Sequence, residues 1–199
     1  MIQQNTGASL VDLGDGVACL EFHSQNNAIG PDILAMIEQS VGIVERDFRG
    51  MVIANEGRNF CVGANLMLML MAAQEGDWDE IDLSVRMFHK AMLTLRYSAV
   101  PVVAAPHRMT LGGGVEVCLA SSRVLPSAET YFGLVEVGVG LIPAGVGAKK
   151  RPFACPSRSP QMRIWRRISR GCSRPLARPK SQPAVTTPWL WVGCVRRIG

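Results

Sequence analysis

Two short glycine-containing stretches carry the residue types that could do chemistry. Gly112, Gly113 and Gly114 precede Glu116, and Glu136 ends a second such stretch twenty residues later. Glycine has no Cβ, so backbone N–H groups there can approach a ligand closely. A helix N-terminus adds unpaired donors and the positive end of the helix dipole. The pattern indicates a site for an oxygen that becomes negative during a reaction, with carboxyl groups beside it as general acid or base.

The elements that must position these groups alternate between strands and helices. Residues 9–13 and 17–22 alternate apolar and polar side chains around Gly14-Asp15-Gly16, which predicts a hairpin. Further strands are predicted at residues 50–54, 101–105 and 123–125, and helices from Pro31 onward and at 66–73, 78–97 and 113–120. Glu136 is placed on a glycine-rich loop. Strands alternating with helices predict an α/β fold with buried strands.

The composition is that of an ordinary globular chain. The 199 residues suffice for one domain with a core, and 48% of them are hydrophobic. No run of 18 apolar residues predicts a membrane span, and residues 1–5 lack a signal-peptide pattern. The six cysteines show neither CxxC spacing nor a paired framework. Such usage is typical of a reducing compartment, so a cytoplasmic protein is expected.

The charge divides the chain into two unlike parts. Residues 1–150 hold all 16 acidic residues, whereas residues 151–199 hold 11 basic residues, no acidic one, and 7 of the 12 prolines. We therefore predict a domain over residues 1–148 and an atypical basic tail over 149–199, disordered or translated out of frame. Reading the gene in its other frames past codon 150 tests this hypothesis. The tail shows no recognised nucleic-acid-binding module, so no specific nucleic-acid partner is expected.

Three stretches carry a resemblance to a known family. They are Asn59–Leu66 (NFCVGANL), Leu111–Glu116, and Tyr131–Gly147 (YFGLVEVGVGLIPAGVG). On these motifs residues 8–148 resemble the crotonase (enoyl-CoA hydratase/isomerase) superfamily. The phrases GASLVDLGDGVACLEFHS and EGRNFCVGANLMLML most resemble the hydratase-like module of bacterial 3-hydroxyacyl-CoA dehydrogenase fusion proteins. The resemblance implies a crotonase-like spiral of ββα units, truncated in this chain.

The resemblance also implies roles for particular residues. Backbone N–H groups of Ala64 and Gly113 would hold the thioester oxygen of an acyl-CoA, and Glu116 and Glu136 would hold a water as base and acid. Their pKa values are expected to be pushed apart. The implied activity is enoyl-CoA hydratase in fatty acid β-oxidation. Further substrate contacts are implied at Gly63, Asn65, Leu66, Gly112, Gly114, Phe132, Gly133 and Gly140.

Other interpretations remain open at this level. Isomerases of the family usually keep only the glutamate at position 136, and a chain that binds acyl-CoA without catalysis is a third possibility. Glu116 could also be only a first-turn acidic residue favoured by the helix dipole. The resemblance implies no cofactor, since coenzyme A enters as part of the substrate. No G-x-G-x-x-G fingerprint predicts an NAD site. The isolated histidines His23, His89 and His107 predict no metal site.

Three positions depart from the family pattern. Asn65 stands where Asp is common, Arg108 where many members have Gly, and Val135 where hydratases often have Pro. A positive φ at Arg108 would strain the backbone by about 1 kcal/mol or more.

Met67, Met69 and Met71 could line an acyl pocket or pack as ordinary helix residues. A homotrimer is expected of the family, although the tail lacks the helical pattern that would build it.

Overall fold

A six-stranded sheet lies at the centre of the fold. The computed structural model describes residues 1–143. In order across the sheet the strands are β1 (Gln3–Gln4), β2 (Ala8–Asp12), β3 (Val17–Phe22), β4 (Gly50–Ile53), β5 (Val102–Ala104) and β7 (Arg123–Val124). The first three strands are antiparallel, and β3, β4, β5 and β7 run parallel. The predicted α/β class is confirmed.

The sequence explains two parts of this sheet directly. The predicted hairpin joins β2 and β3 through Gly14, Asp15 and Gly16, which all have positive φ. Strand β4 lies between parallel neighbours, and all four of its residues are buried. Burial on both faces is why this strand is a continuous apolar run without alternation.

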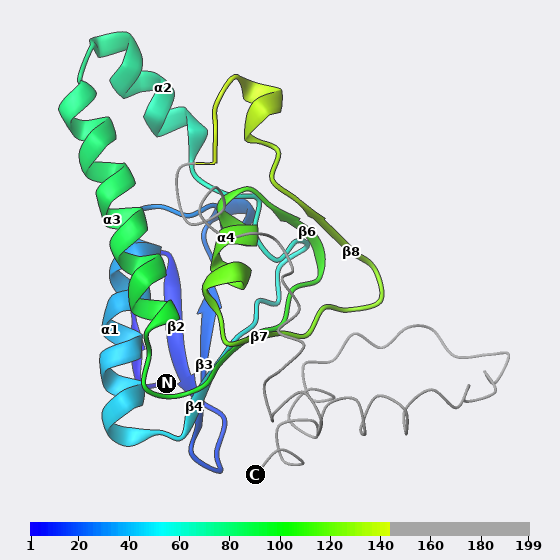
Figure 1. Ribbon diagram of the computed structural model, residues 1–199. Coiled ribbons are helices and arrows are strands. Elements are labelled where there is room, and N and C mark those ends of the chain that lie inside the picture. The colour runs from blue at the N-terminus through cyan, green and yellow to red at the C-terminus, as the bar shows by residue number, and fades with distance from the viewer. Residues whose placement is uncertain (144–199) are drawn as a thin grey trace, which may run out of the picture. The chain divides into compact units, whose positions relative to one another are not determined.

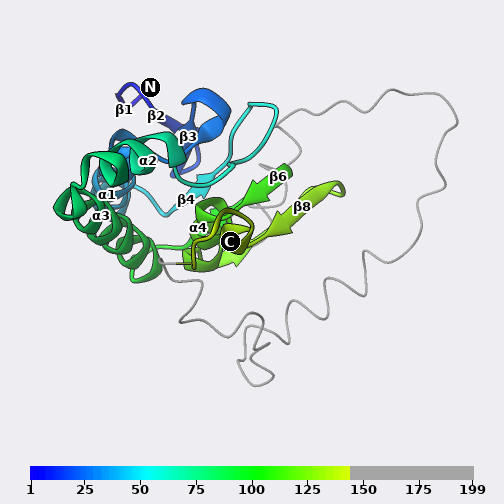
Figure 2. The same cartoon turned by 90° about the horizontal axis from the view of Figure 1, so that it is seen from above.

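The described residues form four α-helices. They are α1 (Pro31–Asp47), α2 (Leu66–Glu75), α3 (Trp78–Arg96) and α4 (Gly113–Ala120), and two short 3-10 helices are η1 (Gln25–Asn27) and η2 (Glu136–Val139). Helices α1 and α3 pack against each other beside the sheet, and α4 lies between α3 and a second, smaller sheet (Figures 1 and 2). The predicted helices are all present, with ends that differ by at most two residues where an end was predicted.

The smaller sheet was not predicted. It pairs β6 (Arg108–Leu111) with β8 (Thr130–Gly133) in parallel, with Leu111 opposite Gly133. Glu136 then begins the 3-10 helix η2. The prediction of a loop at this second glycine-containing stretch was therefore wrong. These four-residue strands show no clear alternation, and they exist because a distant partner is available.

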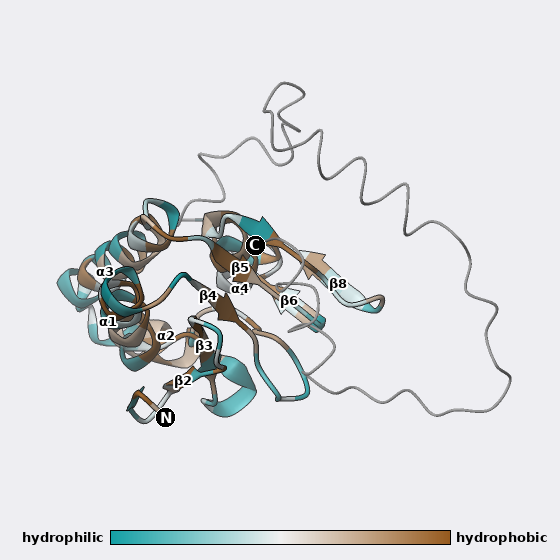
Figure 3. Cartoon of the chain, turned by 90° about the horizontal axis from the view of Figure 1, so that it is seen from below, coloured by the Kyte–Doolittle hydropathy of each residue, from teal (hydrophilic) through white to brown (hydrophobic). Residues whose placement is uncertain are grey.

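The core lies between the large sheet and the helices. Its largest fully buried side chains include Phe22 on β3, Phe60 before α2, and Ile37 on α1. Figure 3 shows the apolar strand β4 at the centre and hydrophilic outer surfaces on α1 and α3. The spacing of three and four in α1 therefore places one apolar face on the core.

Asn55 ties the loop before the site to the large sheet. Its side-chain oxygen accepts from Phe22 N at 2.7 Å, and its amide nitrogen donates to Phe60 O at 2.5 Å. Asn55→Ala leaves both buried backbone groups unpaired, at about 1–3 kcal/mol each. We expect the free energy of unfolding in urea to fall by about 2–5 kcal/mol. Gln74→Ala, which removes an exposed amide on α2, should change it by less than about 0.5 kcal/mol; equal losses would contradict the assignment.

The expectations for the basic tail lie outside the described residues, as does the end of the predicted 1–148 domain. Among residues 1–143, no helix has the length and apolar character needed to cross a membrane.

Candidate active site

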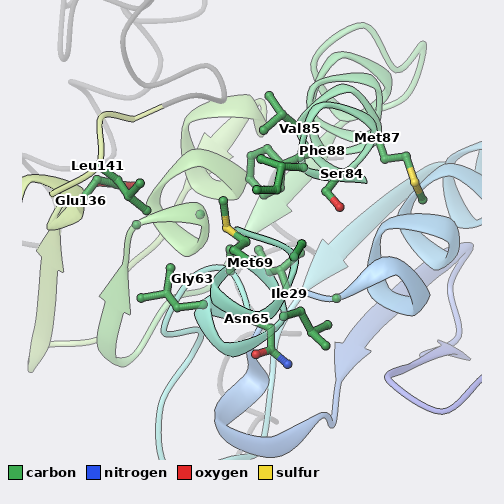
Figure 4. A pocket seen from close by; sticks show the side chains of 18 of the residues that line it. Ile29, Gly63, Asn65, Met69, Ser84, Val85, Met87, Phe88, Glu136 and Leu141 are labelled. Carbon is green, nitrogen blue, oxygen red and sulfur yellow. The ribbon is translucent and has the colours of Figure 1, made fainter. Parts of the chain in front are cut away.

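A cavity of ≈ 420 Å³ brings the two glycine-containing stretches together. Its wall comes from four parts of the chain: the entry to α1, the turn before α2 with α2 itself, the inner face of α3, and the segment around α4 and η2. Figure 4 shows Met69 from α2, Val85 and Phe88 from α3, and Glu136 and Leu141 from the last described segment around this space. The interior is mainly apolar, and two carboxylates from distant motifs reach it.

The turn at Gly63 and Ala64 directs one backbone N–H away from the neighbouring segment. Gly63 O accepts from Ile29 N at 2.8 Å, and Asn65 N donates to Ile29 O at 3.2 Å. No peptide bond among the described residues is cis. In a trans peptide the N–H points opposite to the C=O. Ala64 N–H therefore points away from Ile29, and Ala64 lines the cavity.

The turn at Gly112 directs a second backbone N–H in the same way. Gly112 has φ +51° and ψ −120°, a conformation that suits glycine. Its carbonyl accepts from Val115 N at 2.9 Å and Glu116 N at 3.2 Å, so it points into α4. Gly113 N–H, on the same peptide plane, therefore points out of the helix start, where the dipole is positive.

The two turns are in contact. A Cβ built on Gly63 would lie 3.2 Å from Gly113 N and 3.1 Å from Leu111 O. Because Ala64 follows Gly63 directly, the amides of Ala64 and Gly113 belong to adjoining turns at one cavity wall. This arrangement can hold one oxygen atom between two N–H donors.

Glu116 lies in the first turn of α4 and lines the cavity. Only 4% of its surface is exposed. A first-turn acidic residue that served only the helix dipole would be expected at the surface. Glu116 is instead buried at the cavity, and its chemical role stays a prediction.

Glu136 reaches the same cavity from the end of β8. Gly112 N donates to Gly133 O at 2.9 Å, which joins the two motifs three residues before Glu136. Glu136 Oε1 lies 3.1 Å from where a Cβ on Gly112 would stand. Glu136 Oε2 is buried and accepts no hydrogen bond within residues 1–143. A buried carboxylate oxygen needs a donor, and a water in the cavity can supply it.

Not every residue implied by the resemblance lines the cavity. The lining includes Gly63, Ala64, Asn65, Leu66, Gly112, Gly113, Glu116 and Glu136. Gly114 instead packs against Cys61. Phe132 and Gly133 lie in strand β8, and Gly140 directly follows η2 with φ +76°. None of these four is among the lining residues, and their contact with a substrate stays a prediction.

The three departures from the family pattern have identifiable structural effects. Asn65 caps α2 by accepting from Met67 N at 3.2 Å, so it keeps the turn that an Asp would make. Arg108 has φ +47°, so it begins β6 under the strain of a left-handed non-glycine residue. Val135 has φ −106° and ψ 7° just before η2, a conformation outside the usual range of proline.

Ile29 and Phe88 are among the lining residues that reasoning from the sequence missed. Ile29 holds the Gly63 turn through its backbone, and Phe88 packs beside Gly113, where a Cβ would lie 3.2 Å from the ring. Phe88 lies within the helix predicted at residues 78–97, but its packing against the start of α4 was not predicted. Met69 and Met71 line the cavity, whereas Met67, the third methionine considered for an acyl pocket, does not.

The described histidines make local contacts. His23 Nε2 lies 2.9 Å from Ser9 Oγ, and His107 Nε2 lies 2.8 Å from Gly57 O. Within residues 1–143, no group of three or more His, Cys, Asp or Glu could hold a metal ion.

Comparison with known proteins identifies relatives of the chain. Residues 12–159 match the model of the family described as "Enoyl-CoA hydratase/isomerase". A "Probable 3-hydroxyacyl-CoA dehydrogenase" of Bacillus subtilis is 55% identical over 150 residues, which cover 75% of this chain and 19% of that protein. A "Putative fatty acid oxidation complex trifunctional enzyme" of Rickettsia felis is 29% identical, over 74% of this chain and 20% of that protein. The chain thus spans about a fifth of the length of these relatives.

The fold has close counterparts among solved structures. An enoyl-CoA hydratase from Polaromonas sp. JS666 superposes with a TM-score of 0.67 at 27% identity, covering 74% of this chain and 60% of that one. A second, from Streptomyces coelicolor, described as a putative enoyl-CoA hydratase, gives 0.65 at 26% identity, covering 72% and 53%. The fold predicted from the glycine-containing motifs is confirmed over the described residues.

Proposed function

This chain belongs to the enoyl-CoA hydratase/isomerase (crotonase) family, and we propose that it adds water to the double bond of a 2-enoyl-CoA thioester. Its relatives include multifunctional proteins named for 3-hydroxyacyl-CoA dehydrogenase or fatty acid oxidation. We propose fatty acid β-oxidation as the setting of the reaction, with this chain corresponding to a hydratase module.

The proposed reaction uses the two amides and the two carboxylates together. One glutamate removes a proton from water as its oxygen bonds to C3 of the enoyl group. The π electrons move to the thioester oxygen, where Ala64 N–H and Gly113 N–H stabilise the enolate charge. The other glutamate gives its proton to C2, so the elements of water are added across the double bond. General acid and base groups contribute about 10²–10⁴ of the rate.

The observation that carries the proposal is that Glu116 and Glu136 reach one mainly apolar cavity beside the two amide turns. Glu116 is buried, and Glu136 Oε2 has no donor among the described residues. An isomerase of this family needs only the second glutamate, so the presence of both favours hydration. Met69 and Phe88 supply the apolar surface that an acyl chain would contact.

Hydration of crotonyl-CoA tests the proposal directly. We expect the absorbance of the conjugated thioester to fall as the double bond is consumed. Turnover of a 3-enoyl-CoA to its 2-enoyl isomer, with no hydration, would replace the hydratase assignment with the isomerase one. Binding of acyl-CoA with neither reaction would instead favour a non-catalytic binding protein.

A further inference from the structure

The thiol of Cys61 contacts both turns that carry the cavity amides. Gly63 N donates to Cys61 Sγ at 3.4 Å, a separation suited to a sulfur acceptor. A Cβ on Gly114 would lie 2.8 Å from Cys61 Cβ and 3.1 Å from Sγ. The Cys61 side chain therefore occupies the space that the first turn of α4 leaves open by having glycine there.

The backbone of Cys61 fixes the same region to β6. Its N–H donates to Met109 O at 3.2 Å, and its carbonyl accepts from Leu111 N at 2.9 Å. Leu111 precedes Gly112 directly. Cys61 thus links the turn at Gly63, the strand leading to Gly112, and the start of α4.

We propose that Cys61 is a positioning residue that sets the separation of the Ala64 and Gly113 amides through its contacts with Gly63 and Gly114. The inference rests on the proposed function for its catalytic consequence, and on the contacts of Cys61 with Gly63 and Gly114 for its structural one. Cys61 itself does not line the cavity and takes no part in the bond changes.

A reactive role for this thiol fits the surroundings poorly. Cys61 is fully buried, and burial raises the pKa of its thiol to about 12. The thiolate is the reactive form, so the group stays a neutral thiol near pH 7. A neutral sulfur can accept the Gly63 N–H while filling space against α4.

Cys118, which lies on α4, provides a matched control. It is also buried, at 1% exposed. Burial raises the pKa of its thiol, and the nearby Cys61 raises it further. Cys118→Ala removes the same sulfur volume from this part of the core, and the Gly63 contact stays in place. Comparing it with Cys61→Ala separates lost packing from lost positioning.

The test has one readout in the free protein and one during turnover. In ¹⁵N-labelled protein, hydrogen exchange of the Gly63 amide should be faster in Cys61→Ala and unchanged in Cys118→Ala. For crotonyl-CoA hydration, Cys61→Ala should lower kcat by about 10- to 100-fold with little change in KM, since small misplacements of reacting groups cost that much. Cys61→Ser, which keeps an acceptor, should recover most of the loss.

The outcomes distinguish this proposal from the proposed function. Equal kcat values and equal Gly63 exchange in the two alanine variants would overturn the role of Cys61. If the wild-type protein shows no hydration, the proposed function fails, and Gly63 exchange still decides the structural claim. If Cys61→Ala does not fold, Cys61→Ser decides, because an oxygen acceptor must change the Gly63 amide shift and an unchanged shift refutes the bond.

Discussion

Replacing either Glu116 or Glu136 with glutamine should lower kcat for crotonyl-CoA hydration by about 10²–10⁴. Glutamine keeps the size of the side chain and can still form hydrogen bonds, but it cannot act as a general acid or base near pH 7. Because the two carboxylates act on one water, their effects should not add, and the double variant should be little worse than the worse single one. Steady-state kinetics at fixed pH, with thermal unfolding recorded for each variant, measure this.

Glu75→Gln is the control for charge. Glu75 lines the same cavity from the end of α2, so its replacement removes an equal charge from the lining without touching the proposed water. Its kcat should stay near that of the wild-type protein. Full hydration by Glu116→Gln would return Glu116 to the role of a first-turn acidic residue. Full hydration by Glu136→Gln would remove the second carboxylate from the mechanism.

The same pair separates hydration from isomerisation. Moving a double bond needs one carboxylate to shift a proton, whereas adding water needs a base for the water and an acid for C2. Glu116→Gln should therefore keep any 3-enoyl to 2-enoyl isomerisation that the protein has, and Glu136→Gln should lose it. Loss of both reactions in both variants would indicate shared binding rather than separate proton transfers.

Local patterns predicted the elements of this fold better than its long-range pairings. The spacing of apolar residues in α1 and the glycines between β2 and β3 each specify their structure locally. Strands β6 and β8 are short, and among the strands of the described residues each pairs only with the other. Their pairing depends on a segment about twenty residues away, so the four residues of either strand carry too little signal.

The candidate site shows the same division. Glycine before a carboxylate marked Gly113, Glu116 and Glu136, because backbone access and acid–base chemistry each restrict the residue type. Nothing local marks Ile29 or Cys61, whose importance arises from bonds to Gly63. A backbone clamp can be made by nearly any residue, and a buried thiol looks like an ordinary core residue. Such supporting contacts become visible only in three dimensions.

Gly63→Ala should lower kcat for hydration by about 10²–10³, comparable to the loss of one oxyanion donor. Gly63 has φ +97°, and an added Cβ would lie 3.1 Å from Leu111 O and 3.2 Å from Gly113 N. Both neighbours are backbone atoms, so they cannot rotate aside as a side chain could. Relief requires the two turns to move apart, which displaces Ala64 N–H, Gly113 N–H or both from the thioester oxygen.

Gly14→Ala separates this effect from backbone strain. Gly14 has φ +84° in the β2–β3 turn, and an added Cβ there meets nothing within 4 Å. Both variants carry the cost of a left-handed alanine, about 1 kcal/mol, and should lose stability in thermal unfolding. Only Gly63→Ala adds a clash beside the cavity amides, so only its kcat should fall, measured well below both melting temperatures. Equal kcat values in the two variants would mean that the spacing of these turns does not control the reaction, and the paired amides would lose their place in the mechanism.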